Sequence, residues 1–487
     1  MRISLCAAFA AGLALSAAAP AEDTIPLRAV NKAGEVIDAA IEAYGGAEAL
    51  QNLRTVARKS TFTTWATNQS RKPGPPWDEG TQENFQAVDL EDRIYVTENS
   101  GVAGGFEFST RQVIEGDKGW NISYRAGSVT TIPNPDFNTS SGPLIRITAP
   151  LLVKQLMQRR QTSHWLGETE LNGRPHDIIT LVMEVGPALS LYFDRETHLL
   201  SRSERVLPPF GQVDYRFSGY QEIGGIPFAK DFKLYLNDQP NLYIDFASTR
   251  INQPLDQYTA LPADFEMVEG VAPATEVSVK EIAEGVFQAG SGTAYGMFVD
   301  MGDYVVAVGA TAGVADRIRK LREAGVDKPI RYAVLTHHHN DHLAGVPDYE
   351  AEGATLFTVR ENEAVVRANA SNGDALKLQF VKDRYVFDSN GHRLEIYDIG
   401  PTPHVEHLLV AYLPATGVLF EADHFANPTA GSIPPAQPNT RRLAEAIDQL
   451  GLNVKTIIGA HSPRIASIGD LRASLALQPR VEITAAP

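Results

Sequence analysis

The hydrophobic pattern changes character along this chain of 487 residues. Over residues 28–54 the apolar positions recur at spacings of three and four, which is typical of an amphipathic helix, and Gly45 and Gly46 break this pattern before residues 47–53. Farther along, short stretches of alternating apolar and polar residues are separated by turn residues such as Asn172 and Gly173. This alternation predicts a meandering antiparallel sheet, crossed by one helix over residues 151–160. We therefore expect residues 22–265 to form a mainly β domain.

In the remaining half, short apolar runs alternate with segments of helical spacing. Strands are expected over residues such as 331–335 and 418–422, and a helix over residues 314–323. This alternation favours a layered α/β architecture for residues 277–487. Residues 266–276 lack either periodicity and contain Gly and Pro, so we expect them to be the linker between the two domains.

The densest cluster of polar residues directly follows one of these apolar runs. It consists of His337, His338, His339, Asp341 and His342. In extended backbone alternate side chains point the same way, so His337 and His339 can hold one ion while His338 points away. Asp341 and His342 follow the turn and can reach a second ion. Imidazole and carboxylate are ligands that zinc prefers. The alternative is a solvated histidine-rich loop.

Three more polar side chains stand at the ends of later apolar runs. His404 precedes the apolar run 408–413, whereas Asp423 and His461 each follow one directly. Chemistry in α/β folds gathers at the carboxyl-terminal tips of strands. One such residue alone is more typical of a cap or a turn. Four such tips in one domain favour a shared metal site.

These residues carry a resemblance to a known family. Residues 277–487 resemble the metallo-β-lactamase fold superfamily, an αββα sandwich of hydrolases with one or two metals between its sheets. The resemblance implies a first metal held by His337, His339 and His404. It implies a second metal held by Asp341, His342 and His461. Asp423 would bridge the two metals.

The resemblance also implies an activity, that of a hydrolase with two divalent metal ions, by default zinc. Two such ions lower the pKa of a shared water, and the metal-bound hydroxide attacks the substrate. Asp341 would orient this nucleophile and is the expected catalytic residue. Asp423 stands where many zinc β-lactamases have Cys or Ser, so the site is similar to those of glyoxalase II and lactonases. The expected reaction is cleavage of an ester, lactone, thioester or amide bond.

Other functions stay open at this point. They are β-lactam hydrolysis, a persulfide-dioxygenase-like oxidoreductase with one iron, and a binding protein that keeps a metal for stability. The complete second set of ligands favours two ions over one. The sequence departs from the family at Gly309, where the family often has Asp after the strand.

The N-terminal domain has a resemblance of its own. Segments 44–50 and 191–197 are similar to periplasmic lipoprotein-carrier-type β-sheets. This similarity implies a half-barrel that binds an apolar group or helps to frame the substrate. A purely structural role is the alternative.

Composition and the first residues restrict the partners and the location. The net charge is −16 without a cluster of Lys and Arg, which disfavours nucleic acid and anionic membranes as partners, so we expect a small-molecule substrate. Residues 1–21 form a signal-peptide pattern with cleavage after Ala21, and no later run is long enough to span a membrane. We expect a periplasmic or secreted protein. Cys6, the one cysteine, lies in this leader, so the mature chain has no thiol chemistry.

Overall fold

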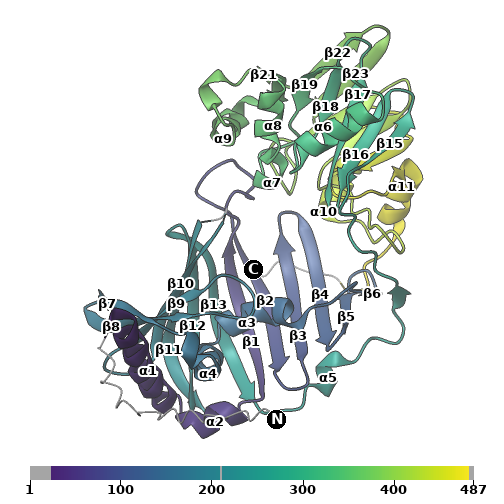
Figure 1. Ribbon diagram of the computed structural model, residues 1–487. Helices are drawn as coiled ribbons and strands as arrows, with labels where there is room; N and C mark the ends of the chain where they lie inside the picture. The colour runs from purple at the N-terminus through teal and green to yellow at the C-terminus, as the bar shows by residue number, and fades with distance from the viewer. Residues whose placement is uncertain (1–23, 209–210, 482–487) are drawn as a thin grey trace, which may run out of the picture.

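The computed structural model describes residues 24–208 and 211–481, which form two regions, one above the other in Figure 1. The lower, N-terminal region is built on one large sheet, and the upper, C-terminal region on two smaller ones. The expected signal peptide, residues 1–21, lies outside the described residues. Within the described part of the chain, no helix is both long enough and apolar enough to cross a membrane.

The N-terminal sheet holds fourteen strands in the order β14-β6-β5-β4-β3-β2-β1-β13-β12-β11-β10-β9-β8-β7. Neighbouring strands are antiparallel, as the alternating pattern predicted, except that β14 runs parallel to β6. The strands are β1 (Thr55–Trp65), β2 (Glu79–Asp89), β3 (Ile94–Ala103), β4 (Phe106–Glu115), β5 (Lys118–Ser123), β6 (Ser128–Thr131), β7 (Trp165–Leu171), β8 (Arg174–Leu181), β9 (Leu189–Asp194), β10 (Leu200–Leu207), β11 (Gly211–Ile223), β12 (Ile226–Leu236), β13 (Gln239–Ile251) and β14 (Glu266–Val268).

One element differs from the expected division of the chain. β14 occupies the first three residues of the segment 266–276, which the sequence predicted to be a linker. Met267 and its neighbours pair with β6, with Glu266 opposite Ser128. The connection between the regions is therefore shorter than the absence of periodicity suggested, because a three-residue edge strand is too short to show a period.

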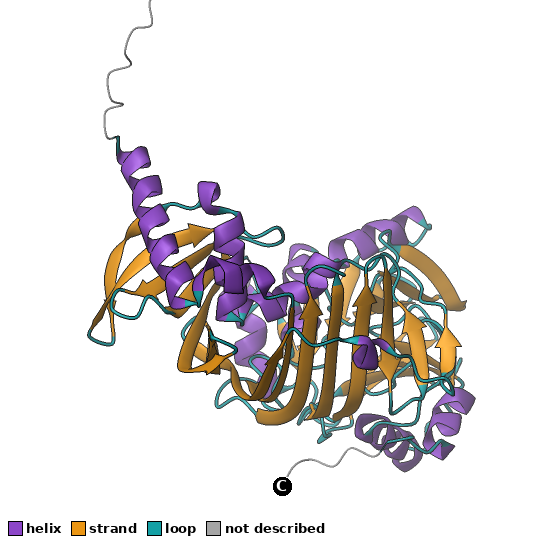
Figure 2. Ribbon diagram, turned by 90° about the horizontal axis from the view of Figure 1, so that it is seen from below, coloured by secondary structure: helices purple, strands orange, loops and turns teal. Residues whose placement is uncertain are grey.

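Helices cover one face of this sheet, as Figure 2 shows. The helical segment expected over residues 28–54 is divided into two at Gly45 and Gly46, where the sequence predicted a break. Gly45 adopts a φ of +92°, which glycine reaches without steric cost. The buried core beneath the helices joins Ile37, Leu152 and Phe228. The helices are α1 (Ile25–Ala43), α2 (Gly46–Asn52), α3 (Phe137–Arg146) and α4 (Ala149–Gln158), while α5 (Asp256–Thr259) follows β13.

The C-terminal region has two sheets. The first has the order β15-β16-β17-β18-β19-β20-β21 and the second β22-β23-β24-β25-β26-β27. The strands of the first are β15 (Ser278–Ala283), β16 (Val286–Ser291), β17 (Ala294–Asp300), β18 (Val305–Val308), β19 (Ile330–Val334), β20 (Thr355–Thr358) and β21 (Leu378–Phe380). Those of the second are β22 (Arg384–Ser389), β23 (His392–Asp398), β24 (Leu409–Leu413), β25 (Val418–Glu421), β26 (Thr456–Gly459) and β27 (Ala466–Ser467).

These two sheets pack face to face between layers of helices. Val308 and Val334 of the first sheet meet Phe420 of the second in one buried core. Separate cores lie under the helices on the two outer faces. The predicted layered α/β architecture, with its αββα order, is confirmed. The helices are α6 (Val314–Glu323), α7 (Asn340–Leu343), α8 (Val346–Ala351), α9 (Glu363–Ala368), α10 (Pro438–Gln449) and α11 (Ile468–Ala476).

The strand directions bring the chemical residues to one edge of the sandwich. β18 and β19 run parallel in the first sheet, and β25 and β26 run parallel in the second. The loops after β19, β25 and β26 therefore meet at the same edge, as in other sheets with parallel strands. In Figure 1 the loop between β1 and β2 reaches α7 at this edge, so the N-terminal region adjoins it.

Candidate metal centre

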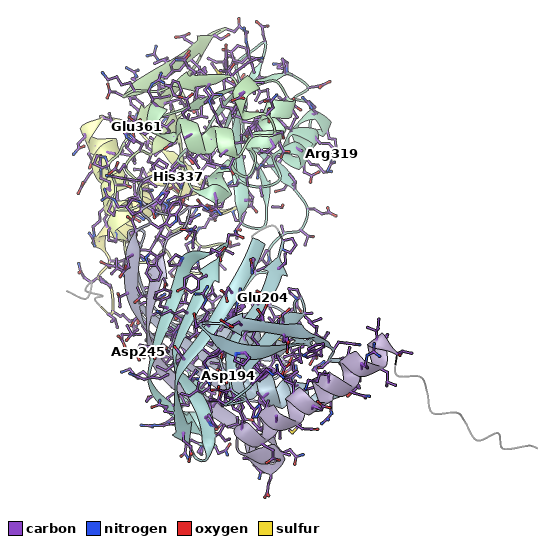
Figure 3. All side chains as sticks on the ribbon, turned by 90° about the vertical axis from the view of Figure 1, so that its left-hand side faces the viewer. Asp194, Glu204, Asp245, Arg319, His337 and Glu361 are labelled. Carbon is purple, nitrogen blue, oxygen red and sulfur yellow. The ribbon has the colours of Figure 1, made fainter. Side chains whose placement is uncertain are left out.

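All seven expected metal ligands stand in loops or on the short helix at this shared edge. His337 and His339 follow β19, and Asp341 and His342 lie on α7. Figure 3 places His337 in the C-terminal region. The other three ligands follow β23, β25 and β26, and they are His404, Asp423 and His461. The structure brings all seven into two neighbouring groups.

The first group consists of His337, His339, His404 and Asp423, whose ligand atoms lie within 4.8 Å of one another. Asp423 Oδ2 lies 3.2 Å from His337 Nε2 and 3.3 Å from His404 Nε2. Among the described residues, His337 Nε2, His339 Nδ1 and His404 Nε2 are buried without a hydrogen-bond partner. Buried polar atoms rarely stay unsatisfied, so these inward-facing nitrogens fit a divalent metal ion.

The second group consists of Asp341, His342 and His461, again within 4.8 Å of one another. His342 Nε2 lies 3.0 Å from His461 Nε2 and 3.4 Å from Asp341 Oδ2. Asp423 reaches this group as well, because its Oδ2 is 2.8 Å from His342 Nε2 and its Oδ1 is 3.0 Å from His461 Nε2. One carboxylate thus touches both groups, in the place that a bridging ligand requires.

Backbone carbonyls orient three of these imidazoles. A carbonyl only accepts hydrogen bonds, so the ring nitrogen facing it must carry the proton. His339 Nε2 donates to Ser70 O at 3.1 Å, and His404 Nδ1 donates to Gly104 O at 2.8 Å. His461 Nδ1 donates to Thr293 O at 2.7 Å. In a neutral ring the other nitrogen keeps its lone pair for a metal, which is how outer partners orient metal-binding histidines.

The charge states in the first group suit metal binding. Burial and the adjacent His342 hold the pKa of His337 well below its ordinary value. Burial lowers the pKa of His339 to about 3. Both rings are neutral at pH 7, which is the form that binds metals. Burial opposes ionisation of Asp423, but His342 and His337 outweigh it and hold the Asp423 pKa well below the ordinary value.

Two groups beside Asp423 have raised pKa values for different reasons. Burial disfavours the charged form of His461, but the hydrogen bond to Asp423 prevails and raises the His461 pKa to about 9. A cation bound at His461 Nε2 would replace the proton on that nitrogen. Burial raises the pKa of Glu421 to about 8. The Glu421 carboxyl accepts the backbone N–H of His424 at 2.9 Å, so its position is fixed.

The N-terminal region also contacts the second group. Gln69, on the loop between β1 and β2, donates through Nε2 to Asp341 Oδ1 at 2.8 Å and to Asn340 Oδ1 at 2.5 Å. The Asp341 side chain is 49% exposed, which leaves it accessible to a substrate. Gln69 therefore fixes the orientation of the carboxylate that the sequence predicted to be catalytic.

Two hollows open at the metal centre, on either side of His461. A pocket of about 330 Å³ is lined by Phe106 of the N-terminal region and by Phe425 and Asp423 of the C-terminal region. A larger cleft of about 1040 Å³ lies between the two regions and reaches Asp341. His461 lines both hollows, so a substrate bound at the metal centre has space in two directions.

Three other histidines near the ligands have partners of their own. His338 is buried and donates through Nε2 to Ser70 O at 2.8 Å, away from both ligand groups, as the alternation predicted. His407 Nδ1 lies 2.6 Å from Asp398 Oδ2. His424 is buried, with Nδ1 2.9 Å from Ala422 O. None of these three lines either hollow.

The packing around Gly309 accounts for glycine at this position. Its φ is +90°, and an added Cβ would lie 3.0 Å from the ring of Phe420. Its carbonyl accepts the hydroxyl of Tyr349 at 2.8 Å. Aspartate at this position would be strained and crowded, so the neighbouring packing requires glycine here.

Sequence reasoning missed the contribution of the N-terminal region to the centre. Ser70, Gly104 and Gln69 lie in turns that the sequence marked only by their Gly and Pro content. The carbonyl contacts involve residues separated in the sequence by 269 and 300 positions. No local pattern signals such a contact, because every residue type offers a carbonyl.

One family model matches the part of the chain that carries the metal centre. It is described as the Metallo-beta-lactamase superfamily and matches residues 311–461. No curated protein matches the chain. Among solved structures, a metallo-beta-lactamase from Pontibacter korlensis is 21% identical, covers 41% of this chain and 98% of its own, and has a TM-score of 0.34. One from Hirschia baltica is 20% identical over 41% and 96%, with a TM-score of 0.33. FIM-1 from Pseudomonas aeruginosa, in the mono-zinc form, is 21% identical over 41% and 94%, with a TM-score of 0.33.

Proposed function

We propose, from a C-terminal region that has the metallo-beta-lactamase-type fold, that this protein is an exported hydrolase of small molecules. It would use two divalent metal ions, by preference zinc, to cleave an ester, lactone, thioester or amide bond. The observation that carries the proposal is the position of Asp423, which touches both groups of candidate ligands. Export is inferred from the leader pattern of residues 1–21.

The donor set supports the choice of metal. His337, His339 and His404 would hold one ion and Asp341, His342 and His461 the other, with Asp423 shared. Five imidazoles and two carboxylates suit zinc, whereas magnesium and calcium prefer oxygen ligands. Two divalent ions bound here would polarise a carbonyl group and lower the pKa of a water molecule.

The protein's own groups would handle the proton. Asp341 is exposed, and Gln69 holds its Oδ1 at 2.8 Å while its Oδ2 lies 3.6 Å from His461 Nε2. From this position the carboxylate can accept a proton from the attacking water and pass it to the leaving group, which is general acid–base catalysis. The pocket beside Phe425 and the larger cleft can receive the two sides of the scissile bond.

Chelation tests the proposed function. The mature chain is assayed with p-nitrophenyl acetate, δ-valerolactone, acetylthiocholine and nitrocefin, before and after treatment with a chelator. We expect hydrolysis of at least one of the first three substrates, its loss on chelation and its recovery with added zinc. Turnover that is insensitive to chelation would refute the metal-dependent mechanism.

Substitution of Asp341 tests its role. Asp341→Asn keeps the size of the side chain but removes the proton-accepting charge, so kcat/KM should fall by about 100-fold or more, as for loss of a general base. Asp374→Asn is the matched control, because Asp374 is an exposed aspartate of the same region outside both ligand groups. Equal activity of the two variants would remove Asp341 from the mechanism.

A further inference from the structure

The larger cleft is shared between the two regions of the molecule. Trp77, Gln239 and Asn241 line it from the N-terminal region, and Asp341 and His461 line it from the C-terminal region. Its volume of about 1040 Å³ is enough for a substituent of a small-molecule substrate. The N-terminal sheet therefore contributes a wall to the space that opens at the metal centre.

The N-terminal wall is built from two adjacent connections. Trp77 lies half-buried at the end of the loop between β1 and β2, the loop that also carries Gln69. Gln239 and Asn241 lie at the start of β13, next to the turn after β12. β1 pairs with β13, so the two connections stand side by side. The contact of Gln69 with Asp341 holds this wall against the metal centre.

The N-terminal wall carries no charged side chain and combines the amides of Asn and Gln with the apolar surfaces of Trp77 and Leu236. Asp341 and His461 are the charged or titratable side chains among the residues that line the cleft, and none of the lining residues is Lys or Arg. The amide groups of Asn68, Gln239 and Asn241 line it without a hydrogen bond to another described side chain or backbone group. Amide side chains both donate and accept hydrogen bonds, and an aromatic ring offers a flat apolar face.

We propose that this cleft binds an uncharged substituent of the substrate that carries hydrogen-bonding amide or hydroxyl groups. This inference rests on the proposed function, because the substituent is attached to the bond that is cleaved at the metal centre. An anionic substituent would find no Lys or Arg in the cleft and would lie beside the carboxylate of Asp341, so carboxylates are disfavoured. A purely apolar substituent would leave the amides of the wall without partners.

Matched substrates test the proposal. p-Nitrophenyl N-acetylglycinate is compared with p-nitrophenyl pentanoate, which has a chain of equal length without the amide, and with p-nitrophenyl hemisuccinate, which is anionic. Glucono-δ-lactone is compared with δ-valerolactone, so that hydroxyl groups are tested separately from amides. We expect kcat/KM to favour the neutral polar member of at least one pair and to be lowest for the hemisuccinate.

Variants then locate the preference in the cleft. In Gln239→Leu and Trp77→Ala the preference for the polar member, expressed as a ratio of kcat/KM values, should fall by roughly 3- to 10-fold, the loss expected for one hydrogen bond or contact. Gln221→Leu is the matched control, because Gln221 is an exposed glutamine on β11 outside the cleft. Preservation of the ratio in both cleft variants, or preference for the hemisuccinate, would overturn the proposal.

A binding measurement separates this proposal from the proposed function. N-Acetylglycinamide has no bond activated for hydrolysis, and its binding is followed by calorimetry. Binding that is weakened in Gln239→Leu but not in Gln221→Leu supports the cleft even if no ester is hydrolysed. Binding that is equal in the two variants contradicts it even if the esters are hydrolysed.

Discussion

Single backbone carbonyls decide which nitrogen of an imidazole faces the metal centre. Ser70 O accepts from His339, and Gly104 O accepts from His404, so the opposite nitrogens of these rings point inward with free lone pairs. Loss of such outer partners typically costs about 10- to 100-fold in metal affinity or activity. The ligand residues and their orientation thus come from different parts of the chain.

The ligands themselves could be predicted from the sequence, whereas their partners could not. His337, Asp423 and His461 each follow an apolar run, and this position next to a strand end is visible in the sequence. Ser70 and Gly104 act through backbone oxygens, so the identity of their side chains carries no signal. Glu421 was missed because its raised pKa comes from burial, which depends on packing between strands and loops.

The buried carboxylate of Asp194 stabilises the N-terminal region. Asp194, shown in Figure 3, is a buried carboxylate that accepts from Arg174 Nη2 at 2.9 Å and from the backbone N–H of Thr197 at 2.9 Å. Burial opposes its ionisation, but these hydrogen bonds prevail and depress its pKa well below the ordinary value. Asp194→Asn should lower the free energy of unfolding at pH 7 by about 2 kcal/mol, as for loss of a charged hydrogen bond.

The pH dependence of this loss follows from the depressed pKa. A carboxyl group with a depressed folded-state pKa stabilises the protein above its unfolded pKa of about 3.9 and loses this effect as the pH falls toward the folded value. The difference between wild type and Asp194→Asn should therefore shrink below about pH 4 in urea unfolding followed by tryptophan fluorescence. Asp245→Asn is the control, since Asp245 is 63% exposed. A difference that stays constant with pH would contradict this account.

Among the secondary-structure elements, the β3–β4 hairpin contacts the C-terminal region at a metal ligand. Its tip carries Gly104 and Gly105, both with positive φ, and the Gly104 carbonyl accepts from His404 and from Asn439 Nδ2 at 3.0 Å. Phe106, the next residue, has its ring centroid 5.6 Å from that of His404. The hairpin therefore sets the position of a metal ligand in the other region.

Crowding at this tip should weaken metal binding. An added Cβ at Gly105 would lie 2.1 Å from Asn439 Oδ1, so Gly105→Ala should displace the hairpin from His404. We expect the affinity for zinc to fall by about 10- to 100-fold in competition with a chromophoric chelator.

Gly116→Ala is the matched control for this variant. Gly116 also has a positive φ, +60°, but an added Cβ there would meet nothing within 4 Å. The two variants share the backbone strain and differ in the crowding. Equal zinc affinities would show that the hairpin does not position His404.

Elements with strong periodicity could be predicted, and short or interrupted elements could not. The helix expected over residues 151–160 is α4, shifted by two residues. The break at Gly45 within residues 28–54 was also predicted, but the contact that requires glycine there was not: an added Cβ at Gly45 would lie 2.5 Å from the carbonyl oxygen of Gly225. That close approach is a contact between distant segments, which the helical spacing alone does not reveal.

At the scale of the whole molecule, two regions together build the candidate metal centre. The C-terminal sandwich supplies all seven candidate ligands, and the N-terminal sheet supplies outer hydrogen bonds and one wall of the cleft. The sequence predicted a mainly β domain followed by a layered α/β domain. It left open whether the N-terminal sheet binds an apolar group, helps to frame the substrate or has a purely structural role. Contacts between regions depend on three-dimensional proximity, so they have no counterpart in hydrophobic patterns.

Arg125 tests the coupling of the two regions. Arg125 is buried in the turn between β5 and β6. Its guanidinium donates to Pro435 O and to Ala436 O, both at 2.8 Å, and these carbonyls belong to the loop that follows Asp423. Arg125→Met leaves these carbonyls without their partner and should cost about 2–4 kcal/mol. Hydrogen exchange of the amides in residues 425–437 should become faster.

An exposed arginine provides the control for that experiment. Arg319, labelled in Figure 3, pairs with Asp316 and Glu323 on the surface of α6, and its side chain is 54% exposed. Arg319→Met should change stability by no more than about 0.5 kcal/mol. Unchanged exchange of residues 425–437 in Arg125→Met would show that the regions are not coupled through this contact.

The proposed function requires that the seven candidate ligands hold two divalent metal ions. Elemental analysis by mass spectrometry of the purified, zinc-loaded full-length protein measures the number of ions per chain. We expect two zinc ions in the wild type and a single ion in His461→Ala, which keeps the first ligand group intact. One redox-active iron per chain in the protein as purified, or a wild type that holds no more zinc than His461→Ala, would contradict it.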